Sequence, residues 1–141
     1  MTSWIVVDTN VFVAALIGRE GNNRHVLRAC LLGKARPIMG QALFTEYEAV
    51  LSRDIFRMSP LSSVERQELF EAFLNVCVWV QVYYSWRPNL HDEGDNHLLE
   101  LAIAGGAAAV VTNNVSDFKG GDLRFPEIHI LTPMQFLKEL L

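Results

Sequence analysis

The chain has 141 residues, 50% of them hydrophobic, and its 12 Lys and Arg against 16 Asp and Glu give a formal charge of -4. This composition excludes an intrinsically disordered chain, and the length suits one globular domain over residues 1–141. A sequence pI near 5.5 argues against coating of nucleic acid by bulk positive charge, although nucleic acid stays open as a substrate.

Two further features bear on where the protein works. No basic leader precedes the first apolar run, and no stretch approaches the roughly 18 apolar residues that a membrane helix needs. We therefore expect a cytoplasmic protein without membrane contacts. Cys30 and Cys77 lie in apolar segments without metal-ligand spacing, so we expect buried free thiols.

The first half of the chain alternates between strand-like and helical patterns. Short β-branched runs indicate buried strands, and apolar residues at helical spacing indicate helices. In chain order we predict a strand at 4–7, a helix at 11–17 closed by Gly18, a polar turn at 19–23, a helix at 24–32, a strand at 36–40, a helix at 41–51, a helix from Ser62 or Ser63 to about Asn75, and a long strand at 76–84.

The second half continues this alternation. We predict a polar segment at 91–96, a helix at 98–104 ended by Gly105 and Gly106, strands at 108–112 and 128–131, and a last helix that Thr132 caps and Pro133 begins. Strands that alternate with helices predict an α/β fold, and near-continuous apolar strands fit a mostly parallel sheet covered on both faces. Functional groups of such sheets gather at the carboxyl ends of the strands.

Acidic residues from four separate segments are candidates for this edge of the sheet. Asp8 directly follows the first strand, and Asp117 lies in the loop after the fourth. Asp95 opens the helix after the polar segment, and Glu46 lies within the third predicted helix. Each has an ordinary alternative. Asp8 and Asp95 suit helix caps, Asp117 suits a turn, and a helix Glu is usually solvated.

Carboxylates that converge on one pocket repel one another unless they take up protons or bind a cation. No zinc spacing is present, because the four histidines are scattered at His25, His91, His97 and His129. An all-oxygen site fits Mg²⁺ or Mn²⁺, which polarises a phosphoryl oxygen and lowers the pKa of a bound water. The acidic set therefore favours phosphodiester hydrolysis.

Four segments carry a family resemblance. They are Val6-Val7-Asp8-Thr9-Asn10-Val11, then Glu46-Tyr47-Glu48-Ala49-Val50-Leu51, then Asp92-Glu93-Gly94-Asp95-Asn96 with Leu98-Leu99-Glu100-Leu101-Ala102, and last Val111-Thr112-Asn113-Asn114-Val115-Ser116-Asp117-Phe118. In order, spacing and chain length, this set resembles the PIN-domain ribonucleases, in particular the VapC-like toxins of toxin-antitoxin systems. The resemblance implies a three-layer α/β/α PIN-like domain that cleaves RNA with one or two Mg²⁺ or Mn²⁺ ions.

The resemblance also assigns the site by motif position. The catalytic and metal-binding acids are Asp8, Glu46, Asp95 and Asp117, with Asp92 as a neighbouring acid. Many members carry an Asp where this chain has Asn114, but a variant of the family has Asn there and the acid three residues later. We therefore expect Asp117 to be the fourth acid and Asn114 to be a hydrogen-bonding neighbour.

Other residues are expected to support these acids or the substrate. Asn10 and Thr112 would orient Asp8 and a metal-bound water, although ordinary loop hydrogen bonding explains them equally well. Cations at the rim would contact RNA phosphates, and the candidates are Arg19, Arg24, Lys119 and Arg124. For any one of these cations, a solvated surface charge is the simpler explanation.

The expected partners follow from the same resemblance. They are an RNA substrate, a small antitoxin protein and a second copy of the chain in a homodimer or higher oligomer. The alternatives are an RNA-processing PIN nuclease that is not a toxin and a catalytically degenerate PIN module that binds RNA or a partner. A phosphatase of the haloacid dehalogenase type needs a second Asp two residues after Asp8, where this chain has Asn10.

Overall fold

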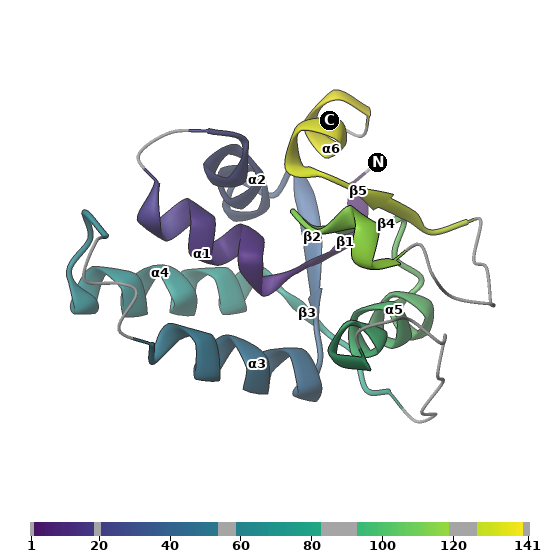
Figure 1. Ribbon diagram of the computed structural model, residues 1–141, viewed down its shortest axis with the longest axis horizontal. Coiled ribbons are helices and arrows are strands. Elements are labelled where there is room, and N and C mark those ends of the chain that lie inside the picture. Colours follow the sequence, from purple (N-terminus) through teal and green to yellow (C-terminus); the bar gives the residue numbers. More distant parts are fainter. Residues whose placement is uncertain (1, 19–20, 54–58, 83–92, 119–126, 140–141) are drawn as a thin grey trace.

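The computed structural model describes residues 2–18, 21–53, 59–82, 93–118 and 127–139, with the backbone alone for residues 93–96 and 117 (Figure 1). The elements in these ranges are β1 (Ser3–Val7), α1 (Thr9–Ile17), α2 (Asn22–Leu31), β2 (Ala35–Met39), α3 (Gln41–Leu51), α4 (Ser63–Val76), β3 (Val78–Trp79), α5 (Glu93–Gly105), β4 (Ala109–Val111), the 3-10 helix η2 (Val115–Phe118), β5 (His129–Leu131) and α6 (Pro133–Glu139).

The described strands form one parallel sheet in the order β3-β2-β1-β4-β5. The chain moves outward from β1 to β2 and β3, and then returns to the other side of β1 for β4 and β5. In register, Ile5 pairs with both Pro37 of β2 and Ala109 of β4, and Val7 pairs with Val111. The order therefore reverses between β1 and β4, which is where such sheets open a binding crevice.

Helices cover both faces of this sheet (Figure 1). Helix α5 packs on β1, β2 and β4, whereas α2 and α4 contact β2 from the other side. Helix α1 packs against α2 and α3, and α6 packs against α2 and β5. This is the predicted three-layer α/β/α arrangement, and its sheet is parallel at every described pairing.

The core is built on the central strand and on a cluster of aromatic rings. Ile5 and Val6 of β1 are fully buried. The Phe12 ring centroid lies 5.4 Å from that of Tyr47 and 5.3 Å from that of Phe73, so the cluster joins α1, α3 and α4. Burial of each such ring contributes roughly 1.5–3 kcal/mol. Helix α3 is thereby fixed beside the end of β1.

Two of the predicted helix starts are confirmed by their capping bonds. The Ser62 hydroxyl accepts from the Glu65 amide, and the Glu65 carboxylate accepts from the Ser62 amide, which is a capping box before α4. Thr132 and Gln135 form the same reciprocal pair ahead of α6.

The strand predicted at 76–84 is wrong over most of residues 76–82, and residues 83–84 lie outside the described ranges. Val76 is the last residue of α4, and β3 has two residues before the chain leaves the sheet. The reason is that β3 is an edge strand whose described partner is β2. Strand β2 ends at Met39 because Gly40 begins the turn into α3, and the last bond between the strands runs from the Val80 amide to the Met39 carbonyl.

Three helices begin earlier than their apolar patterns indicate. They begin at Thr9, Asn22 and Glu93 rather than at residues 11, 24 and 98, so the predicted polar turn at 19–23 ends inside α2. The first turn of a helix has free amide groups that polar residues and water satisfy, and hydrophobic periodicity therefore misses it.

The two cysteines are free, as predicted. Cys30 is fully buried and Cys77 half-buried, and burial raises the pKa of each thiol to about 12. Within the described ranges, no helix is long and apolar enough to cross a bilayer.

The link between α3 and β1 is testable at Tyr47, which is 1% exposed and donates its hydroxyl to the Val7 carbonyl at 2.8 Å. Removal of a buried donor leaves its acceptor unsatisfied, so Tyr47→Phe should lower the free energy of unfolding by about 1–2 kcal/mol in urea titrations. The exposed neighbour Glu48 provides the control, because Glu48→Gln should stay within about 0.5 kcal/mol of wild type. Equal stability of Tyr47→Phe and wild type would contradict this role of the hydroxyl.

Candidate active site

Asp8 stands directly after β1 at the carboxyl edge of the sheet, and its side chain is held by residues from two other segments. Its Oδ2 accepts from the Thr112 hydroxyl at 2.8 Å and from the Asn10 side-chain amide at 3.1 Å. Although Asp8 occupies the N-cap position of α1, its side chain makes no capping hydrogen bond. The side chain is therefore held by Thr112 and the Asn10 side chain rather than by a capping hydrogen bond.

A network of amide side chains fixes these donors. Asn10 also donates to the Thr112 hydroxyl oxygen at 3.3 Å, and its own oxygen accepts from the Asn113 amide at 3.1 Å. The Asn113 side chain donates to Asn23 of α2 at 2.9 Å, and the Asn114 amide donates to Thr112 at 3.0 Å. The loop after β4 is thus tied to both α1 and α2, which fixes the two donors to Asp8.

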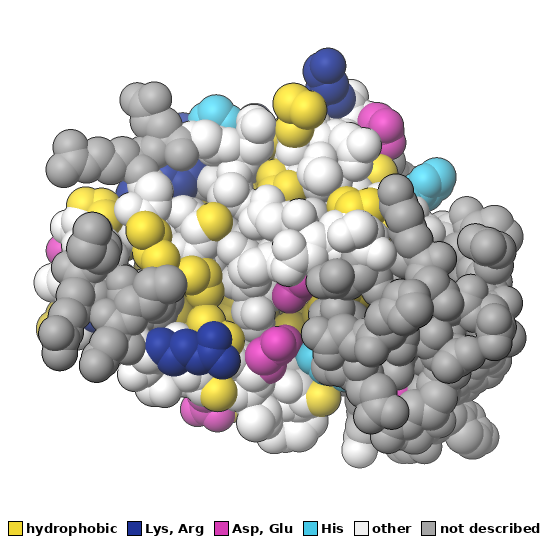
Figure 2. Space-filling model, in the orientation of Figure 1, with side chains coloured by type: hydrophobic (Ala, Val, Ile, Leu, Met, Phe, Trp, Pro, Cys, Tyr) yellow, Lys and Arg dark blue, Asp and Glu magenta, His cyan; other side chains and the backbone are white. Residues whose placement is uncertain are grey.

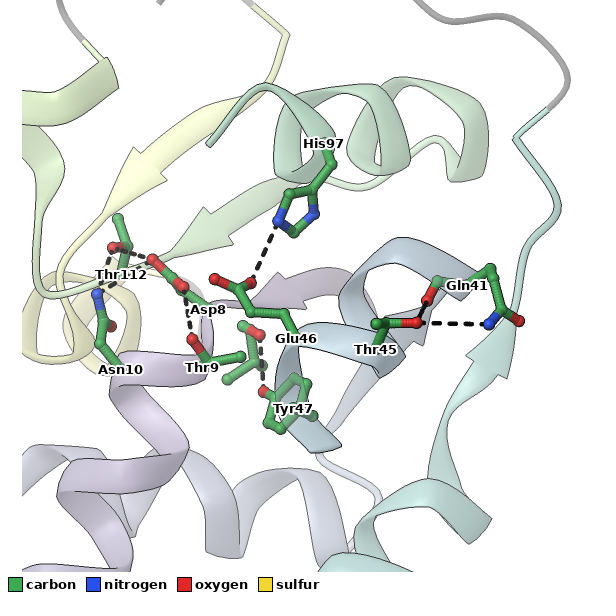
Figure 3. Close-up of polar contacts among 10 residues, drawn as sticks. Asp8, Thr9, Asn10, Gln41, Thr45, Glu46, Tyr47, His97 and Thr112 are labelled. Carbon is green, nitrogen blue, oxygen red and sulfur yellow. Dashed lines mark hydrogen bonds and ion pairs between the residues drawn. The ribbon is translucent and has the colours of Figure 1, made fainter. Parts of the chain in front are cut away.

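Glu46 supplies a second carboxylate from α3. Tyr47, the next residue, donates its hydroxyl to the Val7 carbonyl. This bond fixes the backbone of Glu46 relative to the end of β1. In Figure 3 the Glu46 carboxylate lies between Asp8 and His97. Its Oε2 lies 3.2 Å from the His97 Nε2.

The pKa of Asp8 is raised above its ordinary value. Burial is the largest cause, because the side chain is almost entirely removed from water, and the negative charge of Glu46 adds to it. The hydrogen bond from Thr112 and the nearby amides of Thr9 and Asn10 oppose the shift. An ionised Asp8 is thus stabilised by its donors and destabilised by its burial and by Glu46.

The chemistry of these groups suits a hard divalent cation. Asp8 and Glu46 offer carboxylate oxygens, and the buried Glu46 Oε2 has the His97 Nε2 as a polar neighbour at 3.2 Å. A cation between the two acids would remove the charge repulsion that raises the pKa of Asp8. Among the side chains that the structure describes, no three His, Cys, Asp or Glu gather as a metal site.

The other predicted site residues have different outcomes. Asp95 lies in the first part of α5 and Asp117 lies in η2, but the description there stops at the backbone. The residues outside the described ranges are Asp92, Arg19, Lys119 and Arg124. Arg24 is described, and its Nε donates to the Ala15 carbonyl at 3.0 Å, which ties α2 to α1. Asn114 uses its backbone amide rather than its exposed side chain in the contact with Thr112.

Sequence reasoning missed three residues at or beside this site. His97 contacts Glu46, Tyr47 anchors α3, and Asn113 connects the loop to Asn23. The sequence carried one usable signal, since His97 stands two residues after the predicted ligand Asp95 on the same helix. The roles of Tyr47 and Asn113 depend on contacts across 40 and 90 residues of sequence.

An apolar groove runs from the site along α1 and the end of α3. It has a volume of about 520 Å³, and its lining comprises Thr9, Asn10, Val13, Ala14, Ile17, Gly18, Val50 and Arg53. Figure 2 shows acidic side chains near the centre of this face and hydrophobic side chains over α1 beside them. Arg53 places an exposed cation at the groove, which the sequence did not single out.

Comparison with known proteins identifies the family of this chain. A family model described as "PIN domain" matches residues 4–116 of this chain. The chain therefore belongs to the PIN domain family, whose members are nucleases. A search of the curated proteins found no match.

A solved structure shares the fold. It is the crystal structure of VapBC2 from Rickettsia felis bound to a DNA fragment from their promoter. One of its chains matches with a TM-score of 0.62 and 17% sequence identity, over 92% of this chain and 98% of that chain.

The raised pKa of Asp8 predicts a pH-dependent cost to stability. Above that pKa the buried carboxylate is ionised in the folded protein, and each unit of upward shift corresponds to about 1.4 kcal/mol. In metal-free buffer at pH 7, Asp8→Asn should therefore unfold at higher urea concentration than wild type. The difference should shrink as the pH falls through the folded-state pKa of Asp8, because the carboxyl then takes up a proton. A constant difference between pH 7 and pH 4 would refute this account.

Proposed function

We propose that this protein is a metal-dependent endoribonuclease and the toxin of a toxin-antitoxin pair. The observation that carries the proposal is the buried Asp8 carboxylate facing Glu46 at the carboxyl ends of β1 and β4. Two acids held together against their mutual repulsion form a site that a divalent cation would complete. Membership of a nuclease family supports hydrolysis of a nucleic acid, and the fold shared with VapBC2 supports the toxin assignment.

In this proposal the four acids Asp8, Glu46, Asp95 and Asp117 hold one or two Mg²⁺ or Mn²⁺ ions. A bound ion of this kind offsets negative charge on phosphoryl oxygens and acidifies a coordinated water. Thr112 and Asn10 keep the Asp8 carboxylate in one orientation through their hydrogen bonds. The Glu46 carboxylate, whose Oε2 lies 3.2 Å from the His97 Nε2, can accept a proton from the attacking water.

Cations near the site would contact the RNA backbone. Arg19, Lys119 and Arg124 keep this role as sequence-based proposals, and Arg53 joins them because it is exposed and lines the same groove as Asn10. The position of Arg24 is better explained by the hydrogen bond from its Nε to the Ala15 carbonyl in α1.

Cleavage of RNA tests the proposed activity. Wild type with Mn²⁺ or Mg²⁺ should cleave single-stranded RNA, and chelation of the metal should abolish cleavage. Asp8→Asn and Glu46→Gln should each lower the rate by more than about 100-fold, because loss of even a supporting partner of a metal ligand costs up to that factor. Glu48→Gln, on the exposed side of the same helix, provides the matched control. Equal cleavage by wild type and Asp8→Asn would contradict the ribonuclease proposal.

Metal binding itself can be measured apart from activity. Calorimetric titration with Mn²⁺ should show binding to wild type and at least about tenfold weaker binding to Asp8→Asn and Asp95→Asn. Mn²⁺ should also raise the melting temperature of wild type more than that of either variant. Glu68→Gln on α4 is exposed and should behave as wild type. If Asp95→Asn and wild type bind equally, Asp95 is not a ligand.

The proposed antitoxin would occupy the groove along α1. The groove is apolar and leads to the acidic site, so one segment of a small protein can cover both. Coexpression with the product of an adjacent small reading frame should give a stable complex that lacks ribonuclease activity. Ala14→Glu puts a charge into the groove and should weaken the complex, whereas Leu32→Glu changes an exposed apolar residue outside it and should not. Active nuclease without such a partner would instead indicate an RNA-processing enzyme.

A further inference from the structure

Two physical effects favour movement of the Glu46 carboxylate away from the acidic site. The side chain is 38% exposed, so it has water to turn toward, and the negative charge of Asp8 repels it. A flexible Glu also loses rotamer freedom when it is held in one place. The hydrogen bond from Tyr47 to the Val7 carbonyl fixes only the backbone of Glu46. A further contact is therefore needed to keep the carboxylate beside Asp8.

His97 of α5 provides this contact. Its Nε2 lies 3.2 Å from the Glu46 Oε2, at the upper limit of N–H···O hydrogen bonds, and its side chain is 20% exposed. A neutral imidazole with its proton on Nε2 can donate to this oxygen without gaining a charge. In Figure 3 the other oxygen of Glu46 points toward Asp8. The contact thus occupies Oε2 and leaves Oε1 for the acidic site.

Close packing brings α5 against the start of α3, which places His97 within reach of Glu46. Leu101, one turn after His97, is buried against the turn that Gly40 makes before α3. A Cβ atom at position 40 would lie 2.9 Å from the Leu101 Cδ1 and 3.3 Å from the Val80 carbonyl oxygen. Both distances are shorter than ordinary contacts, so a side chain at this position would push its neighbours aside. Glycine therefore permits the close approach of the two helices.

Neither group of this contact is held by another polar partner. Among the described residues, the buried Glu46 Oε2 has no polar neighbour other than His97, and the buried His97 Nδ1 has no hydrogen-bond partner. A histidine that serves packing alone usually has its buried ring nitrogens bonded. Loss of the imidazole would therefore leave the Glu46 carboxylate without a donor on this side.

We propose that His97 is a positioning residue for Glu46. It holds Oε2 so that Oε1 stays directed toward Asp8 and toward the cation that the two acids would share. The inference rests on the proposed function, in which Glu46 binds the cation and accepts a proton from the attacking water. His97 itself contacts neither the cation nor the RNA. Loss of such a supporting contact lowers metal affinity or activity by about 10-fold to 100-fold.

NMR of the metal-free protein tests the contact before any metal or RNA is added. In ¹⁵N spectra of the histidine side chains, His97→Gln identifies the His97 signals by their loss. Glu46→Gln should shift the Nε2 signal of His97, because an amide replaces the carboxylate beside it. Glu48→Gln, on the exposed side of the same helix, should leave this signal unchanged. A His97 signal that is the same in Glu46→Gln and in wild type would overturn the proposal.

Two amide substitutions of different length test the role of the Nε2 donor. The amide nitrogen of a Gln lies about where the His Nε2 lies, whereas that of the shorter Asn lies nearer to the Nδ1 position. In calorimetric titration, Mn²⁺ should bind about tenfold more weakly to His97→Asn and within about threefold of wild type to His97→Gln. Circular dichroism checks that both variants are folded. Equal weakening by the two substitutions would contradict the positioning role.

A double substitution shows whether the effect of His97 passes through Glu46. In the Glu46→Gln background, His97→Asn should weaken Mn²⁺ binding no further, because residues that act through one contact are not additive. A further loss as large as that in wild type would mean that His97 acts elsewhere, and the proposal would be wrong.

RNA cleavage separates this inference from the proposed function. Wild type should cleave RNA about tenfold faster than His97→Asn, and His97→Gln should restore most of the rate. If RNA is cleaved and His97→Asn is as fast as wild type, the positioning role is wrong and the nuclease stands. If Mn²⁺ affinity depends on His97 as described but no RNA is cleaved, the positioning role stands and the nuclease proposal fails.

Discussion

The burial of one carboxylate is the constraint on which the site depends. Asp8 is 5% exposed, yet it must be ionised to bind a cation or to act on a phosphate. The surrounding structure provides the donors that make this tolerable, with Thr112 from the end of β4 and Asn10 from the start of α1. Glu46 opposes them, because a second negative charge raises the cost of ionisation. The folded protein thus holds unfavourable charge at one point, which is what a cation site needs.

The topology of the sheet brings these groups together. Strand β1 is central, with β2 on one side and β4 on the other, so Asp8 and Thr112 emerge side by side although they are 104 residues apart. Helix α3 is fixed to the end of β1 by Tyr47, and α5 covers the opposite face of the sheet from α2 and α4. Each part of the site therefore rests on a strand end or on a packed helix. Such elements hold side chains more accurately than loops do.

Local patterns predicted the fold well where burial and periodicity agree. The apolar runs at β1, β4 and β5 and the caps at Ser62 and Thr132 mark elements that the structure contains. The predictions fail where a neighbouring element determines the secondary structure. Residues 76–84 have high strand propensity, but β3 stops once β2 has turned away into α3. The first turns of α1, α2 and α5 are polar, and apolar periodicity therefore carries no information about them.

The sequence by itself determined the class of fold, and it predicted the edge of the sheet and the acids to consider for function, because strand ends and apolar runs are local properties. It also placed Asn10 and Thr112 beside Asp8, through the family's motifs. Tertiary structure alone decided that the Asp8 side chain is held by Thr112 rather than by a capping bond, and that Glu46 meets His97. These facts depend on side chains that approach each other from separate elements, and no local pattern records such distances.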